Sequence, residues 1–174
     1  MDAARLLDPD VLEGLAARPI DEVRALRAEC VDVETGLSYL RRMVQGPLDI
    51  VQREQARRSS GAEADLATLV DELPGLLAEH TRSAGVGRLP QTLEPTTVDP
   101  ELEAELGALV GVGRIGRVTE MPDPELKELA TGLAAFERKV SEQRQAFFER
   151  IDALQAELTR RYKTGEASVE TLLD

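Results

Sequence analysis

The chain has 174 residues with 3% aromatic residues, and its 33 acidic against 21 basic residues give a formal net charge of −12. A charge of this sign argues against direct binding of DNA or of anionic membranes, and it favours a basic protein partner. The composition is typical of long helices around a thin apolar core, so we expect one all-α domain over residues 1–174.

Cysteine usage and the N-terminal sequence predict the compartment. Cys30 is the single cysteine, so no internal disulfide can form, and a reducing setting is expected. The first residues are acidic where a secretion signal would be basic and then apolar, and no stretch approaches the roughly 18 apolar residues of a membrane span. We therefore expect a soluble, cytoplasmic protein.

The first half of the chain is expected to contain one long helix. Residues 1–18 hold scattered Leu and Val between Asp-Pro and Arg-Pro turns, which predicts a short helix or a loose arm. Apolar residues then recur at alternating steps of three and four, as in a coiled-coil seam, at Val23, Leu26, Cys30, Val33, Leu37, Leu40 and Val44. This spacing predicts a helix over 20–57. Pro47, the next seam position, should kink it, and Leu48 and Val51 continue the seam.

Residues 58–123 are expected to hold connecting helices and loops. A polar break precedes an amphipathic helix from Leu66 to about His80, and 82–98 has the composition of a crossing loop. Asp99 should cap a short helix over 100–109, in which Pro100 takes the first position. A glycine-rich flexible connector is predicted over 111–124.

A second long helix is predicted over 124–162, with Asp123 as its cap. Its apolar seam consists of Leu126, Leu129, Leu133, Phe136, Val140, Phe147, Ile151, Leu154 and Leu158. Residues 163–174 form a tail that breaks at Gly165.

Each long helix carries a stripe of polar residues. The first stripe is Glu34, Ser38, Arg41, Gln45 and Asp49, and 103 positions later Glu137, Ser141, Arg144 and Asp152 repeat four of its five members at identical spacing. At about 100° per residue, each set falls within roughly 80° around its helix and forms a line about 22 Å long. Both stripes have the same offset from their seams, so antiparallel packing would relate them by a pseudo-twofold axis. Parallel pairing and pairing of two chains are also compatible with the pattern.

The residue types of the stripes suit a guanine nucleotide. A carboxylate, such as that of Asp49 or Asp152, can accept hydrogen bonds from the N1–H and N2–H groups of guanine. A guanidinium, such as that of Arg41 or Arg144, can donate to O6 and N7, and the serines can donate to phosphates. The alternative for either stripe alone is a solvated helix face with weak surface pairs, but the repetition in spacing and phase favours ligand binding.

The stripes resemble the signature of the RsiG family, the cyclic-di-GMP-dependent anti-sigma factors of sporulating actinobacteria, which is Glu, Ser, Arg, Gln and Asp at the spacing seen from Glu34 to Asp49. The resemblance implies an antiparallel coiled coil that binds two cyclic-di-GMP molecules as a dimer. It also implies that the ligand acts as glue that holds a flagellar-type sporulation sigma factor, WhiG, inactive. Phe148 stands where the second stripe should have Gln, so two unequal half-sites are expected.

Two other functions remain open from the sequence. One is a ligand-free coiled-coil adaptor whose stripes contact protein directly. The other, less favoured, is an enzyme that makes or hydrolyses cyclic-di-GMP. The sequence shows no metal-binding acidic cluster and no nucleophile with a positioned base, so we expect neither catalysis nor a metal site. Gly111, Gly113 and Gly116 have dinucleotide-binding spacing but follow a helical stretch instead of a strand.

Overall fold

The structure is a computed structural model and describes residues 3–60, 95 and 97–165. Every element in these residues is helical, which confirms the all-α class. The α-helices are α1 (Ala3–Leu7), α2 (Ile20–Ser60), α4 (Pro100–Val110) and α5 (Asp123–Thr164), and the 3₁₀ helices are η1 (Pro9–Leu12), η2 (Leu15–Ala17) and η3 (Ile115–Glu120). The predicted helix from Leu66 to His80, most of the loop over 82–98 and the tail after Gly165 lie outside the described residues.

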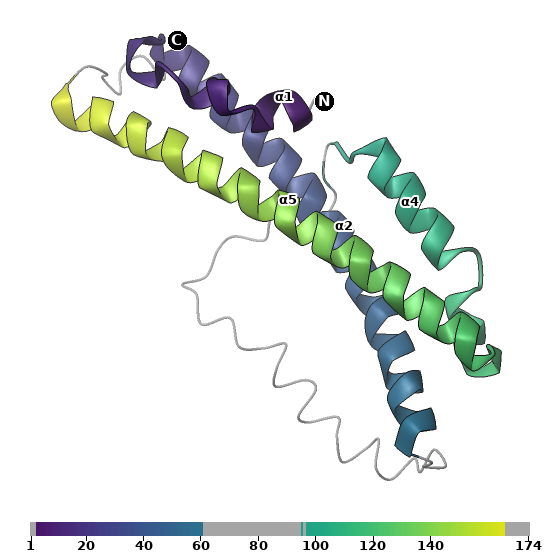
Figure 1. Cartoon of the computed structure of the whole chain (residues 1–174). Helices are drawn as coiled ribbons and strands as arrows, with labels where there is room; N and C mark the ends of the chain where they lie inside the picture. The colour runs from purple at the N-terminus through teal and green to yellow at the C-terminus, as the bar shows by residue number, and fades with distance from the viewer. Residues whose placement is uncertain (1–2, 61–94, 96, 166–174) are drawn as a thin grey trace.

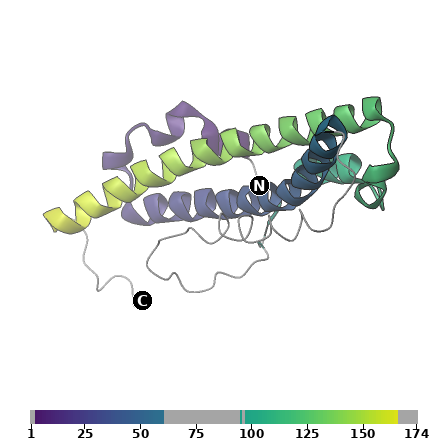
Figure 2. The same cartoon turned by 90° about the horizontal axis from the view of Figure 1, so that it is seen from below.

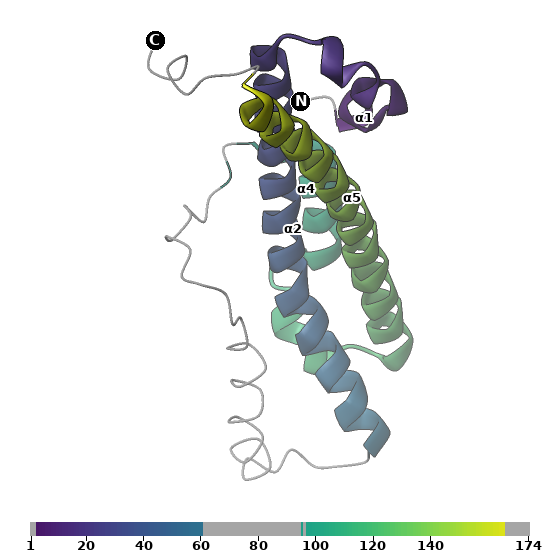
Figure 3. The same cartoon turned by 90° about the vertical axis from the view of Figure 1, so that its left-hand side faces the viewer.

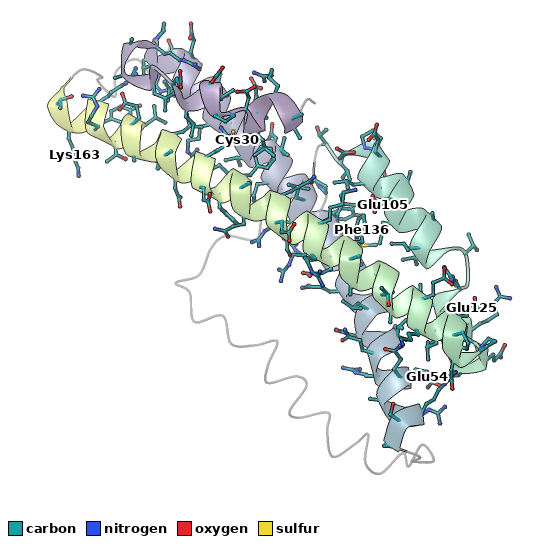
Figure 4. All side chains as sticks on the ribbon, in the orientation of Figure 1. Cys30, Glu54, Glu105, Glu125, Phe136 and Lys163 are labelled. Atoms are coloured by element: carbon teal, nitrogen blue, oxygen red, sulfur yellow. The ribbon has the colours of Figure 1, made fainter. Side chains whose placement is uncertain are left out.

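The two long helices, α2 and α5, pack side by side and run in opposite directions (Figure 1). Glu54 near the end of α2 and Glu125 near the start of α5 lie at one end of the pair, and Lys163 lies at the other (Figure 4). At the first of these ends, Arg58 Nη1 lies 2.6 Å from Asp123 Oδ1. The two long helices therefore pair in antiparallel fashion, as the family resemblance implies.

The apolar seams form the core between these helices. Every predicted seam residue is buried except Val33, Pro47, Leu48 and Ile151, which are half-buried; Val33, Leu48 and Ile151 pack against the core. Phe136 and Phe147 are its largest fully buried side chains. Full burial of an apolar side chain of this kind contributes about 1.5–3 kcal/mol, so the seams provide the main attraction between the helices.

Cys30 is a core residue, as its place in the seam predicts. Its side chain is fully buried, and this burial raises the pKa of its thiol. A buried thiol with a raised pKa is mostly protonated and therefore a poor nucleophile.

The cap predicted for the second long helix is wrong by one position. Pro122, not Asp123, is the cap residue, and it makes no side-chain cap hydrogen bond. Asp123 lies in the first turn instead. Its negative carboxylate interacts favourably with the positive end of the helix dipole and accepts a hydrogen bond from Arg58. The helix also extends two residues beyond the predicted end at 162, to Thr164.

The short helix predicted over 100–109 is confirmed as α4. Asp99 caps it by accepting hydrogen bonds from the backbone N–H groups of Glu101 and Leu102, and Pro100 takes the first position. The prediction of a flexible connector over 111–124 is wrong for residues 115–120, which form η3. Val118 and Met121, three residues apart, are buried against the core and hold this segment in place.

Arg58 fixes η3 to the end of α2. Its guanidinium donates to the backbone carbonyls of Val118 and Met121, at 3.1 and 2.7 Å. It also donates to the buried carboxylate of Glu54, at 2.6 Å. Hydrogen bonds from Arg57 and then from Arg58 lower the pKa of Glu54 to about 2, so this carboxylate stays ionised near neutral pH.

The helix over residues 20–60 bends but does not break at its internal proline. Hydrogen bonding is continuous enough for one helix from Ile20 to Ser60, three residues beyond the predicted end. Figures 2 and 3 show that the C-terminal part of α2 turns away from the line of its N-terminal part. The bend lies in the half that contains Pro47, in agreement with the predicted kink.

The N-terminal segment is packed against the long helices and is not a loose arm. Leu6 in α1 is fully buried. From α5, Arg150 donates to the backbone carbonyl of Leu7, and Arg161 donates to that of Arg18 at 2.8 Å. Two arginines of one helix therefore hold the segment before α2, which we call the N-terminal arm (residues 3–18).

Gly36 allows a close approach between α2 and the segment that precedes α4. A Cβ atom on Gly36 would lie 2.5 Å from the backbone oxygen of Thr97, which cannot rotate away. We therefore expect Gly36→Ala to lower the free energy of unfolding by about 1–3 kcal/mol, although alanine favours helices. Urea denaturation checks this expectation.

Gly46 provides the matched control in the same helix. A Cβ atom there would meet nothing within 4 Å, so Gly46→Ala should raise the free energy of unfolding by about 0.5–1 kcal/mol. A similar gain for Gly36→Ala would contradict the close packing of Thr97 against α2.

Candidate functional site

The two polar stripes meet across the α2–α5 interface. Arg41 Nε, on α2, donates to Glu137 Oε1 and to Ser141 Oγ on α5, both at 3.1 Å. Ser141 Oγ in turn donates to Glu137 Oε1 at 2.8 Å. The three side chains thus form a closed triangle of hydrogen bonds between the helices.

The same triangle recurs with the helices exchanged. Arg144 Nε, on α5, donates to Glu34 Oε1 at 2.9 Å and to Ser38 Oγ at 2.8 Å. Ser38 Oγ donates to Glu34 Oε1 at 2.6 Å. The pseudo-twofold relation expected from the repeated spacing is therefore present in the side-chain contacts. We call these six residues the reciprocal network: Glu34, Ser38, Arg41, Glu137, Ser141 and Arg144.

The reciprocal network lies at the surface and leaves donors unused. The side chains of Arg41 and Arg144 are 36% and 30% exposed. Each arginine bonds through Nε, and within the described residues neither makes a hydrogen bond through Nη1 or Nη2. Ion pairs with this exposure contribute about 1 kcal/mol or less, so the network orients the guanidinium groups more than it stabilises the fold.

Three predicted site residues lie outside the reciprocal network. Gln45 is half-buried, Asp49 and Asp152 are exposed, and none of them makes a hydrogen bond or ion pair with another described residue. Each aspartate follows the serine of its stripe by 11 residues. Because the helices are antiparallel, Asp49 and Asp152 lie on opposite sides of the reciprocal network along the coiled coil. The carboxylates therefore lie about 30 Å apart, at the two ends of one elongated polar face.

The two halves of this face differ at one position. Arg144 Cζ lies 4.6 Å from the ring centroid of Phe148, a cation–π contact. The equivalent residue in the other half is Gln45, which offers an amide. We call Arg41, Gln45 and Asp49 the α2 half-site, and Arg144, Phe148 and Asp152 the α5 half-site.

Other elements pack on the opposite flank of the coiled coil. Gly36 and Lys139 both lie about 180° around their helices from the stripes. The first contacts Thr97, and the second makes an ion pair with Glu105 of α4 at 2.6 Å. Arg150, which binds the N-terminal arm, also projects from this flank. Within the described residues, the stripes thus form an uncovered face.

The other candidate sites give little support for ligand binding. A pocket of about 90 Å³, lined by residues that include Val33, Gly36 and Thr97, lies on the flank away from the stripes and is small for a nucleotide. Gly111 and Gly113 have positive φ values in the turn after α4, which follows a helix and not a strand. In the part of the chain that the structure describes, no group of three or more His, Cys, Asp or Glu residues could hold a metal ion. None of the described helices is long and apolar enough to cross a membrane.

Comparison with known proteins adds a family assignment. The sequence profile described as RsiG-like matches residues 9–77 and 114–174, which include both stripes and both long helices. No curated protein matches the chain. Because the match covers most of the sequence, the chain belongs to the RsiG-like family, and its role is that of an anti-sigma regulator.

Proposed function

We propose that this anti-sigma factor binds cyclic-di-GMP along the paired stripes. The bound nucleotide then completes the surface that holds a sigma factor of the flagellar or sporulation type, such as WhiG. The reciprocal network is the observation that carries this proposal. It presents two equivalent sets of donors and acceptors on one uncovered face, related by a pseudo-twofold axis. A ligand that itself consists of two equivalent halves fits such a face.

The free groups of the face match the edges of guanine. The Nη donors of Arg41 and Arg144 can reach the O6 and N7 acceptors, as arginine does in nucleic-acid recognition. The carboxylates of Asp49 and Asp152 can accept from N1–H and N2–H. Phe148 offers an aromatic ring for stacking in the α5 half-site. Guanine is favoured over adenine because adenine reverses the donor and acceptor at positions 6 and 1.

The length of each stripe favours two ligand molecules. Arg41 and Asp49 are eight residues apart, which corresponds to a rise of about 12 Å along α2. This rise exceeds the width of one purine, so the two side chains contact different bases. Two dinucleotides bound together provide enough bases for both half-sites.

Titration calorimetry of the intact chain with cyclic-di-GMP tests the proposal. We expect saturable binding of two molecules per chain, with the nucleotide recovered chemically unchanged. Cyclic-di-AMP is the matched ligand, with equal charge and size, and should bind at least 100-fold more weakly because its base leaves buried polar groups unpaired. No binding of either nucleotide, or equal binding of both, would overturn the proposal.

A further inference from the structure

Arg27 has an unusual position on α2. Its Nε atom is buried, and within the described residues it has no hydrogen-bond partner and the side chain has no ion pair. Buried polar groups in proteins are nearly always bonded, because an unsatisfied donor costs about 1–3 kcal/mol. Such a donor at the edge of a ligand face indicates a group whose partner comes from outside the chain.

The helix geometry brings Arg27 into line with the first stripe. It precedes Glu34 by seven residues, two helical turns that return the side chain to within about 20° of the same direction. Arg41 pairs with Glu137, and Glu34, seven residues earlier on α2, pairs with Arg144, seven residues later on α5. The same antiparallel register can therefore be extended toward the N-terminal end of α2. The same pairing sets Arg27 across from Asp152, at the outer end of the α5 half-site.

The charge of the polar face suggests that a further cation takes part in binding an anionic ligand. The nine predicted residues include four carboxylates and two guanidinium groups, so their formal charge is −2. Both guanidinium groups already face a glutamate. Each cyclic-di-GMP molecule carries two negative phosphates, which this face would repel without more positive charge.

We propose that Arg27 binds a phosphate of the nucleotide held at the α5 half-site. The inference rests on the proposed function and extends it to a residue outside the repeated stripes. A guanidinium can donate two parallel hydrogen bonds to a phosphate, and one of them would satisfy the Nε donor that the described residues leave without a partner. The position 103 residues later on α5 is Ala130, so the α2 half-site has no equivalent cation. Arg27 therefore acts at the half-site in which Phe148 replaces the amide.

Calorimetric titration with cyclic-di-GMP of the full chain and of Arg27→Gln, Arg27→Lys and Arg117→Gln tests this role. Arg117 is an exposed residue of η3, which Arg58 joins to the end of α2 opposite to Arg27, and it controls for the loss of one positive charge. We expect Arg27→Gln to weaken one of the two binding events about tenfold and to leave the other unchanged. Arg27→Lys should recover part of the loss, and Arg117→Gln should match the unsubstituted chain.

Thermal unfolding without nucleotide separates ligand binding from a structural role. Arg27→Gln should unfold at the same temperature as the unsubstituted chain or higher, since it removes an unbonded buried donor. Equal affinities for Arg27→Gln and Arg117→Gln would overturn the inference and leave the proposed function intact. A lower unfolding temperature with both binding events weakened equally would also overturn it. No binding by the unsubstituted chain would overturn the proposed function and this inference together.

Discussion

Replacing Arg41 and Arg144 together by alanine is expected to lower the affinity for cyclic-di-GMP by a factor on the order of 10³. Each guanidinium supplies forked contacts to a base worth about 1–3 kcal/mol, and the two losses fall on the same bound dimer. The fold should persist, because the seams and not the partly exposed ion pairs hold the helices together. Calorimetric titration measures the affinity, and circular dichroism with thermal unfolding measures the fold.

Arg138→Ala is the matched control for this pair. Arg138 follows Glu137 directly and is exposed, and it points about 80° around α5 from the middle of the stripe. The variant removes a guanidinium close to the site, and its affinity should equal that of the unsubstituted chain. Normal affinity in a folded Arg41→Ala, Arg144→Ala double variant would exclude the stripes as the binding site.

Capture of a purified WhiG-type sigma factor is expected to be at least 100-fold tighter with saturating cyclic-di-GMP than without it. Within the described residues, the stripes alone present the unpaired carboxylates of Asp49 and Asp152 and the unused Nη donors of Arg41 and Arg144. The bound nucleotide would cover these groups and supply its own outer edge to the partner. Immobilised protein, titrated with the sigma factor in the two conditions, measures the ratio. The Arg41→Ala, Arg144→Ala double variant should hold the sigma factor weakly in both.

Thermodynamic linkage gives this prediction a second, independent measurement. If cyclic-di-GMP tightens sigma binding by a given factor, the sigma factor must tighten nucleotide binding by the same factor. Calorimetric titration of nucleotide into the preformed mixture of the two proteins determines that factor. Equal sigma capture with and without nucleotide would favour the ligand-free adaptor, in which the stripes contact protein directly.

The long helices and the stripes could be predicted because both depend on local periodicity. A step of three and four places Val23, Leu26 and Cys30 on one side of a helix whatever it packs against. The stripes have a fixed phase relative to these seams, so once the seams pair with the helices antiparallel, the stripes must lie on a common flank. The residue pattern left the direction of pairing open, and the antiparallel direction implied by the family resemblance is confirmed by the cross-helix contacts.

The cross-helix triangles could not be predicted from the same pattern. Spacing shows that Arg41 and Glu34 share a helix face, and the simplest expectation pairs neighbours within that helix. The structure instead pairs Arg41 with Glu137, and this depends on how far one helix is shifted along the other. The sequence contains no local signal for that shift.

Contacts with irregular segments were also missed. Arg58 and Arg161 resemble ordinary charged residues near helix ends, yet they donate to backbone carbonyls of η3 and of the N-terminal arm. Their partners are backbone carbonyl groups, which every residue has, so no pattern in the sequence identifies them. Arg27 was overlooked for a related reason, since the stripe was defined by what repeats, and Ala130 stands at the equivalent position.

Side-chain contacts at the two ends of the coiled coil fix the register of the helices at its centre. Arg58 binds Asp123 at one end, and Arg24 contacts Tyr162 at the other. A slip by a single residue would displace one helix by about 1.5 Å and rotate its side chains by about 100°, which would break both triangles at once. Arg58 lies 17 residues from Arg41, a rise of about 25 Å. Under the proposed function, a substitution that releases the helices to slide, such as one at Arg58, would therefore weaken nucleotide binding without removing any contact to the nucleotide.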